Sequence, residues 1–134
     1  MNPDDQRALV AAAIRACERA VAPYSKFYVG AALRTRAGKI ISGANVESAS
    51  YGLTCCAERI ALFKALTEGE REFTAIAVAA RKDGGATPCG ACRQLLAEYA
   101  PSATVLVVDT AQPDVIRKFT LPELLPAAFV SVPR

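Results

Sequence analysis

The sequence predicts an α/β protein with three layers, α/β/α, around a central mixed sheet of about five strands. Strands alternate with helices along the chain, and this order covers both faces of a sheet. An early pair of strands joined by a short turn adds an antiparallel hairpin, so the sheet is mixed. The 134 residues suit one domain, spanning 1–134, and 52% of them are apolar, which is enough for one core.

The first predicted helix spans residues 4–21 and ends before Pro23, because proline cannot continue a helix. Six apolar side chains fall on one face of it at helical spacing. They are Leu9, Val10, Ala13, Ile14, Cys17 and Val21. Strands over 29–33 and 39–42 then flank the turn 36–38 and form the hairpin.

The rest of the chain alternates helix and strand, as a covered sheet requires. The predicted segments are a loop over 45–54, a helix over 56–66, a strand over 74–80, a glycine-rich loop over 83–85, a helix over 90–99, a buried strand over 105–108 and a short helix over 121–125. Gly69 ends the first of these helices, and Pro88 precedes the second. We expect no repeats and no linker between separate domains.

The composition favours a small-molecule ligand. The net charge is only +3, and the lysines and arginines are scattered rather than gathered in a stripe, which argues against nucleic-acid binding. No apolar run approaches the length of a membrane span. Residues 1–7 carry two acids and no apolar core, unlike a signal peptide. We therefore expect a cytoplasmic protein without a membrane or nucleic-acid partner.

Five cysteines and no histidine limit the chemistry. The odd number of cysteines argues against a disulfide framework. Without histidine, the chain has no Ser-His-Asp triad, no histidine general base and no imidazole ligand for a metal. Any zinc ion must therefore be held by cysteine, carboxylate and water.

Three cysteines have the spacing of a zinc site. Cys56 begins one predicted helix, Cys89 opens the next, and Cys92 lies one turn further on. Three thiolates with water in the fourth position are typical of a catalytic zinc site rather than a closed structural one. Glu58 lies two residues after Cys56, close to the metal without being a ligand. A carboxylate there can carry a proton between water and a substrate.

Three thiolates leave a zinc site with one net negative charge, which needs compensation. The positive ends of two helix dipoles supply part of it. Arg59 can supply the rest by hydrogen bonding to a thiolate, although a solvated arginine on a helix is the commoner case. Cys17 falls on the apolar face of the first helix and is expected in the core, and Cys55 is expected to pack beside the site.

With these residues in view, the chain resembles the small, homotetrameric cytidine deaminases. The two zinc segments match the zinc-deaminase pattern in which a first ligand, one residue and Glu are followed by Pro-Cys-x-x-Cys. The other matching segments are 23–27, 29–33, 45–47, Tyr51 and 124–129. The resemblance implies zinc-dependent hydrolysis of cytidine and 2′-deoxycytidine to the uridines and ammonia, which is a pyrimidine salvage reaction. It also implies Zn²⁺ as the cofactor and a homotetramer.

The resemblance also implies roles in holding the nucleoside. Asn45 and Glu47 would bind the ribose, chiefly its 3′-hydroxyl. Phe27 would pack against the pyrimidine ring, and the backbone of Ala57 and Glu58 would contact the edge of the base. These residue types suit the task, because amide and carboxylate groups pair with hydroxyls and an aromatic face suits a flat base.

Two further aromatic residues gain roles between subunits from the resemblance. Phe129 would reach into a neighbouring subunit's site and stack on its base, so that each site is composite. Tyr51 would lie at a subunit interface near that site. Without the resemblance, Phe27 and Phe129 would both be assigned to the core. Tyr28 stands where the family often has a smaller residue or proline, beside the expected base pocket.

Four other functions compete with this reading. Blasticidin S deaminases share the size and the three-cysteine segments, but Asn45, Glu47 and Tyr51 fit the nucleoside enzyme better. A non-catalytic, zinc-stabilised binding protein would have no need of Glu58. A thiol redox protein using Cys89 and Cys92 would leave the third cysteine unexplained. Editing of polynucleotides is disfavoured by the lack of a basic stripe.

Overall fold

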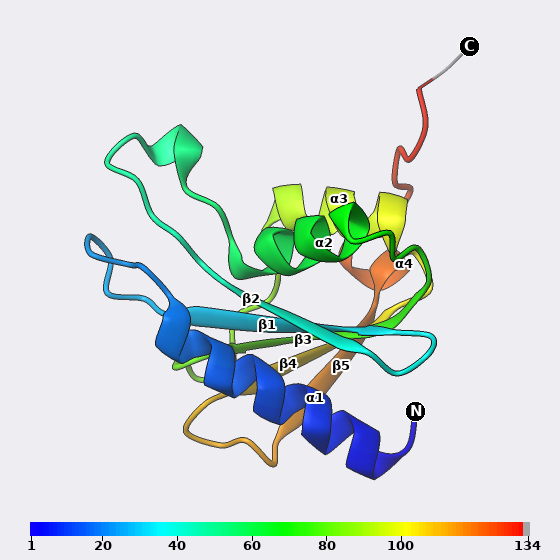
Figure 1. Cartoon of the computed structure of the whole chain (residues 1–134), viewed down its shortest axis with the longest axis horizontal. Helices are drawn as coiled ribbons and strands as arrows, with labels where there is room; N and C mark the ends of the chain where they lie inside the picture. The colour runs from blue at the N-terminus through cyan, green and yellow to red at the C-terminus, as the bar shows by residue number, and fades with distance from the viewer. Residues whose placement is uncertain (133–134) are drawn as a thin grey trace.

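A five-stranded mixed sheet lies between two layers of helices in the computed structural model, which describes residues 1–132 (Figure 1). The strands are β1 (Val29–Thr35), β2 (Ile40–Ala44), β3 (Phe73–Ala80), β4 (Thr104–Asp109) and β5 (Ile116–Thr120). Their spatial order is β2-β1-β3-β4-β5. β3 and β4 run parallel, and the other neighbouring strands are antiparallel. The predicted mixed α/β sheet is confirmed.

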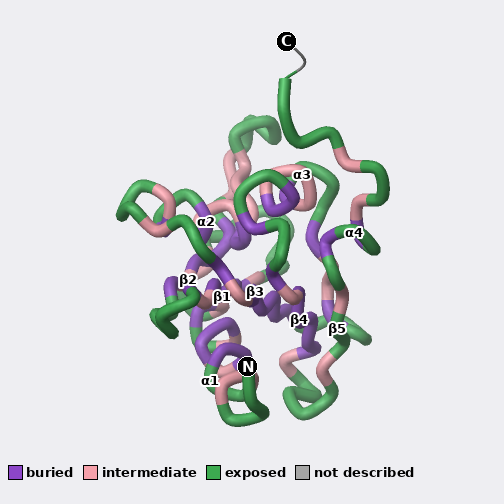
Figure 2. Tube along the Cα trace, turned by 90° about the vertical axis from the view of Figure 1, so that its right-hand side faces the viewer, coloured by how far each residue is buried: buried purple, intermediate pink, exposed green. Residues whose placement is uncertain are grey.

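Helices cover both faces of this sheet (Figure 1). The α-helices are α1 (Pro3–Ala16), α2 (Ala57–Thr67), α3 (Gly90–Tyr99) and α4 (Leu121–Leu124). Single 3₁₀ turns lie directly after α1, at Cys17–Arg19, and between β2 and α2, at Tyr51–Leu53. α1 packs on one face and α2 and α3 on the other, so the buried residues form two clusters, one on each side (Figure 2). Within residues 1–132, no helix combines the length and the apolar character that crossing a bilayer requires.

The first helix begins as its sequence suggests but ends earlier than predicted. Asn2 and Asp5 form a reciprocal capping box at its start. The predicted helix over 4–21 was too long, since the α-helix ends at Ala16 and a 3₁₀ turn follows. Val21 lies outside the helix and is 52% exposed. Its backbone instead forms a β-bridge to Val46, so tertiary pairing overrides the helical pattern.

Two glycines let helices rest directly on the sheet. A Cβ atom on Gly30 would lie 2.0 Å from the carbonyl oxygen of Ala13 in α1. A Cβ atom on Gly43 would lie 2.8 Å from the Ala57 carbonyl oxygen and 2.6 Å from the Ala61 nitrogen. All three distances are too short for a real Cβ atom, so only glycine permits these contacts. Gly43 thereby sets the height of the first turn of α2 above the sheet.

The last strand, β5, was not among the predicted elements. None of its residues is fully buried, since each is either half-buried or exposed, and it therefore presents no apolar run that the sequence pattern can reveal. It pairs along β4 and leads directly into α4, where Thr120 and Glu123 form a second capping box. The predicted helix over 90–99 matches α3, and Gly69 does end the helix over 57–67, with a positive φ of 95°.

Candidate active site

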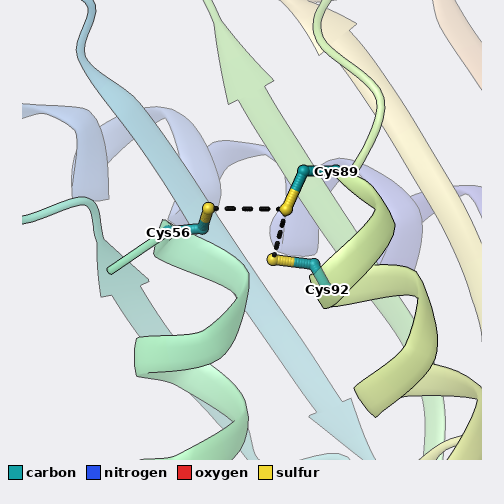
Figure 3. Close-up of side chains that lie close together, drawn as sticks. All are labelled: Cys56, Cys89 and Cys92. Carbon is teal, nitrogen blue, oxygen red and sulfur yellow. Dashed lines mark hydrogen bonds between the residues drawn. The ribbon is translucent and has the colours of Figure 1, made fainter. Parts of the chain in front are cut away.

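The three predicted metal ligands meet between two helix N-termini. Cys56 is the N-cap residue of α2, Cys89 is the N-cap residue of α3, and Cys92 lies in the first turn of α3. Figure 3 shows the three sulfur atoms pointing toward one another across the gap between the helices. The Sγ atoms of Cys56 and Cys89 are 3.7 Å apart, and those of Cys89 and Cys92 are 3.4 Å apart.

The sulfur cluster has the dimensions of a zinc site. Zinc binds thiolate at about 2.3 Å in tetrahedral geometry, which places two ligand sulfurs roughly 3.8 Å apart. The observed separations of 3.7 and 3.4 Å are close to this value. No other group of three or more cysteine or carboxylate side chains in residues 1–132 gathers in this way. The donor set fits Zn²⁺, which favours thiolate ligands.

The cluster already stabilises negative charge on sulfur. A hydrogen bond from the Cys92 thiol, aided by Arg59, lowers the pKa of Cys56 to about 5. The same hydrogen bond, together with burial, raises the pKa of Cys92. One thiol therefore ionises readily while its neighbour keeps its proton. A cation at the centre would favour the ionised form of all of them.

Arg59 faces the sulfurs rather than the solvent. Its Nη2 atom lies 3.5 Å from the Cys56 sulfur and 3.2 Å from the Thr54 carbonyl oxygen, to which it donates hydrogen bonds. Its Nε atom is buried and has no hydrogen-bond partner among residues 1–132. A cation held in this position can offset the charge of a thiolate cluster.

Glu58 places a buried carboxyl group beside the cluster. It lies in the first turn of α2 and is only 5% exposed. Burial raises its pKa to about 7, and a backbone hydrogen bond to the carboxylate opposes this shift in part. A carboxyl group with a pKa near neutral can both accept and donate a proton, as general acid–base catalysis requires.

The cluster opens into a pocket of about 210 Å³. Of the residues predicted from sequence, it is lined by Phe27, Asn45, Cys56, Ala57, Glu58 and Cys89. It is also lined by Val29, Thr54, Val78, Ala86 and Thr87, which sequence reasoning did not identify. Thr87 had a weak signal in the sequence, since it directly precedes the Pro-Cys-x-x-Cys segment; the other four are ordinary strand and loop residues. Tyr28 does not line this pocket and instead faces a separate cavity beside Phe27.

Asn45 holds the entry to β1 in place. Its side-chain Oδ1 accepts a hydrogen bond from the Val29 backbone nitrogen at 2.9 Å, and its Nδ2 donates to the Phe27 carbonyl oxygen at 2.9 Å. The side chain is almost fully buried. Asn45 therefore orients the segment that presents Phe27 to the pocket.

Glu47 and Tyr51 lie in a neighbouring pocket of about 280 Å³, which shares Thr54 with the first. The Glu47 carboxylate accepts hydrogen bonds from the hydroxyl and backbone nitrogen of Ser25 and from the backbone nitrogen of Tyr24. The bonds from Ser25 lower the pKa of Glu47. Tyr51 is 85% exposed and begins the 3₁₀ turn Tyr51–Leu53, which lies in the projecting loop between β2 and α2 (Figure 1).

Phe129 lies outside both pockets of its own chain. Its side chain is 58% exposed, on the segment that leads away from α4 (Figure 1). Its backbone carbonyl accepts a hydrogen bond from the side-chain amide of Gln94 on α3. Within one chain, Phe129 therefore neither joins the core nor touches the cysteine pocket.

Comparisons with known proteins agree with this geometry. The model of the cytidine and deoxycytidylate deaminase zinc-binding region matches residues 3–108. A cytidine deaminase from Halalkalibacterium halodurans is 52% identical over 127 residues, covering 95% of this chain and 96% of that protein. A crystal structure of cytidine deaminase from Burkholderia pseudomallei superposes with a TM-score of 0.88 at 48% identity, covering 96% of this chain and 100% of that one. A blasticidin-S deaminase from Bacillus cereus is more distant, at 36% identity over 78% of this chain and 79% of that protein.

Proposed function

The chain belongs to the cytidine and deoxycytidylate deaminase family, and from this membership we propose that it deaminates cytidine in the pocket lined by Cys56, Cys89 and Glu58. One observation carries the proposal: three sulfurs converge at one small pocket, and the buried carboxyl group of Glu58 lines that pocket together with two of the three cysteines, Cys56 and Cys89. Such an arrangement serves metal-assisted hydrolysis, since it leaves room for both water and a flat ring.

The reaction replaces an amino group by oxygen. Water adds its oxygen to C4 of the cytosine ring and the bond from C4 to the amino nitrogen breaks. One proton of the water passes to N3 and the other to the amino group, which leaves as ammonia. Zn²⁺ held by Cys56, Cys89 and Cys92 supplies the Lewis acidity that makes water a nucleophile near neutral pH.

Glu58 moves both protons in this proposal. Its carboxylate takes a proton from water, gives it to N3, and then returns the second proton to the leaving amino group. The position supports this role, since the side chain is buried in the first turn of α2 and lines the same pocket as Cys56. Among residues 1–132, and in a chain without histidine, Glu58 is the one titratable acid–base group that lines this pocket besides the cysteines.

The nucleoside is held by the residues around the pocket. Phe27 would pack on the pyrimidine ring, and the backbone of Ala57 would meet the edge of the base. Asn45 and Glu47 would bind the ribose. Each retains bonding capacity for this: the Asn45 amide has used one of its two N–H donors, and a carboxylate such as Glu47 has about four acceptor sites, of which three are taken.

The complete site is proposed to form only in a homotetramer. Tyr51 and Phe129 are aromatic, exposed and outside the cysteine pocket of their own chain. Aromatic side chains are enriched at protein interfaces relative to the rest of the surface, which supports this assignment. Phe129 would close the base pocket of a neighbouring subunit, and Tyr51 would lie at the interface beside it. Acceptance of 2′-deoxycytidine, a role in pyrimidine salvage and a cytoplasmic location belong to the same proposal.

The competing functions are weaker. The blasticidin-S deaminase is less similar than the cytidine deaminases, at 36% against 52% identity. A zinc protein without catalysis would gain nothing from a buried carboxyl group in the pocket, since an unpaired buried acid is costly.

The direct test uses purified protein and cytidine. We expect loss of the cytidine ultraviolet absorbance with release of ammonia, inhibition by a zinc chelator, and recovery when zinc is returned. About one zinc per chain should be found by elemental analysis. Turnover of blasticidin S but not of cytidine would contradict the proposed substrate, whereas full turnover in zinc-free protein would contradict the proposed chemistry.

A further inference from the structure

Arg93 makes a set of hydrogen bonds that the reaction described above does not use. It follows Cys92 on α3 and is half-buried. Its guanidinium donates from Nε to the Pro88 carbonyl oxygen at 2.7 Å, from Nη2 to the Thr87 hydroxyl at 3.2 Å, and from Nη1 to the Leu124 carbonyl oxygen at 2.8 Å. No carboxylate of residues 1–132 forms an ion pair with it. The guanidinium is therefore directed at three uncharged oxygens.

Two of these oxygens belong to the loop that delivers Cys89. Thr87 and Pro88 directly precede Cys89, and both Thr87 and Cys89 line the cysteine pocket. Cys89 is exposed, and as the N-cap of α3 its side chain makes no capping hydrogen bond, so its orientation depends on the backbone before it. From its position in α3, Arg93 holds this segment by hydrogen bonds to the Pro88 carbonyl and the Thr87 hydroxyl.

The third oxygen ties the same arginine to the C-terminal segment. The Leu124 carbonyl lies at the last turn of α4, where helix carbonyls lack partners within the helix. The next residue along α3, Gln94, donates a hydrogen bond to the carbonyl of Phe129. Two consecutive residues of α3 therefore hold the two ends of the segment 124–129.

We propose that Arg93 is a positioning residue that locks the Cys89 loop and the C-terminal segment 124–129 to one another. It rests on the proposed function, because it takes Cys89 as a zinc ligand. This role depends on the planar guanidinium group of Arg93, which donates hydrogen bonds to three separate acceptors at once. A lysine ammonium in its place has a single nitrogen and cannot reach all of them.

The test compares Arg93→Lys with Arg71→Lys. Arg71 is a matched control, since its guanidinium also donates to two backbone carbonyls, those of Leu66 and Glu70, but at the far end of α2. The measurements are the rate of zinc release to a chromophoric chelator, the thermal midpoint, and kcat and KM for cytidine. For Arg93→Lys we expect zinc release to be faster by roughly 10–100-fold, the range for groups that orient metal ligands.

We also expect kcat to fall in Arg93→Lys while Arg71→Lys keeps wild-type zinc release and kcat. An arginine that only supported the fold would lower the thermal midpoint without changing zinc release from the folded protein. Zinc release and kcat in Arg93→Lys equal to those of Arg71→Lys would overturn the proposal.

A second variant serves if Arg93→Lys does not fold. Thr87→Val removes one acceptor of the Arg93 fork and leaves the other two contacts in place. We expect faster zinc release than in Arg71→Lys, and a wild-type release rate would overturn the proposal. Zinc release is read without substrate, so wild-type protein that fails to deaminate cytidine would contradict the proposed function and still leave the comparison readable.

Discussion

The cysteine pocket of this molecule is surrounded by packed and buried side chains, whereas two segments away from it, an arm and a C-terminal tail, expose aromatic side chains. Around the pocket, helix starts rest on the sheet, and the side chains of Glu58 and Cys92 are buried. The arm, residues 46–55, projects from the body (Figure 1) and carries the exposed Tyr51. The tail, residues 126–132, carries the exposed Phe129. The difference is what we expect if one chain contains the chemical groups and, as proposed above, neighbouring subunits enclose the substrate.

The largest expected effect tests the chemical half of this comparison. Glu58→Gln keeps the shape of the side chain but removes its proton chemistry. Turnover of cytidine should fall by at least roughly 10²–10⁴-fold, the usual contribution of a general acid–base group. Elemental analysis should still find zinc, because Glu58 is not among the ligands. Near-normal turnover in this variant would remove Glu58 from the mechanism.

Two glycine-to-alanine variants, at Gly43 beside α2 and at Gly52 in the arm, compare how tightly the two regions are packed. In Gly43→Ala, the new Cβ atom would lie 2.6 Å from the Ala61 nitrogen, and we expect a loss of about 1–3 kcal/mol in the free energy of unfolding, as in other overpacked sites. Gly52→Ala, in the arm, meets no atom within 4 Å and should change stability little. Denaturant unfolding of both variants measures the contrast. Equal stabilities would show that α2 can lift from the sheet at little cost.

Phe129→Ala tests whether the tail completes a neighbouring site. Loss of stacking on the base should weaken the free energy of cytidine binding by about 1–3 kcal/mol, by analogy with bases stacked on aromatic side chains. The sharper measurement mixes Phe129→Ala chains with Glu58→Gln chains after dissociation and reassembly. Activity above that of either parent is expected, since some sites then combine an intact Glu58 with an intact Phe129. If light scattering finds a monomer and that monomer is fully active, Phe129 does not complete a neighbouring site.

The smallest expected effect concerns Arg59. Arg59→Gln removes a cation whose Nη2 atom lies 3.5 Å from the Cys56 sulfur. We expect activity only several-fold lower and faster zinc loss to a chelator, because one charge-assisted hydrogen bond to a thiolate sulfur is lost while the helix N-termini still face the cluster. Arg7→Gln, at an exposed position of α1 far from the cysteines in the chain, is the control. Identical zinc retention in the two variants would make Arg59 an ordinary helix residue.

Local pattern was sufficient wherever structure depends on near neighbours. The helix over 90–99 was predicted to the residue, because Pro88 and the apolar spacing mark its start and its face. The sulfur cluster was predicted because its ligands sit at helix starts, and the chain order puts those starts at the same end of the sheet. The roles proposed for Phe27, Asn45 and Glu47 came from the family resemblance, because spacing alone does not suggest them.

The tertiary structure decided what depends on distant partners. Val21 fits the helical pattern in the sequence but instead forms a β-bridge to Val46. Strand β5 pairs with the edge of β4 although it has no apolar run of its own. The fork of Arg93 joins oxygens that lie 37 residues apart in the chain, at Thr87 and Leu124 (124 − 87). Hydrogen bonds of this kind leave no periodicity in the sequence, because a guanidinium selects its acceptors by their position in space. Hydrophobic spacing and helix caps, in contrast, act within a few residues and can be read along the chain.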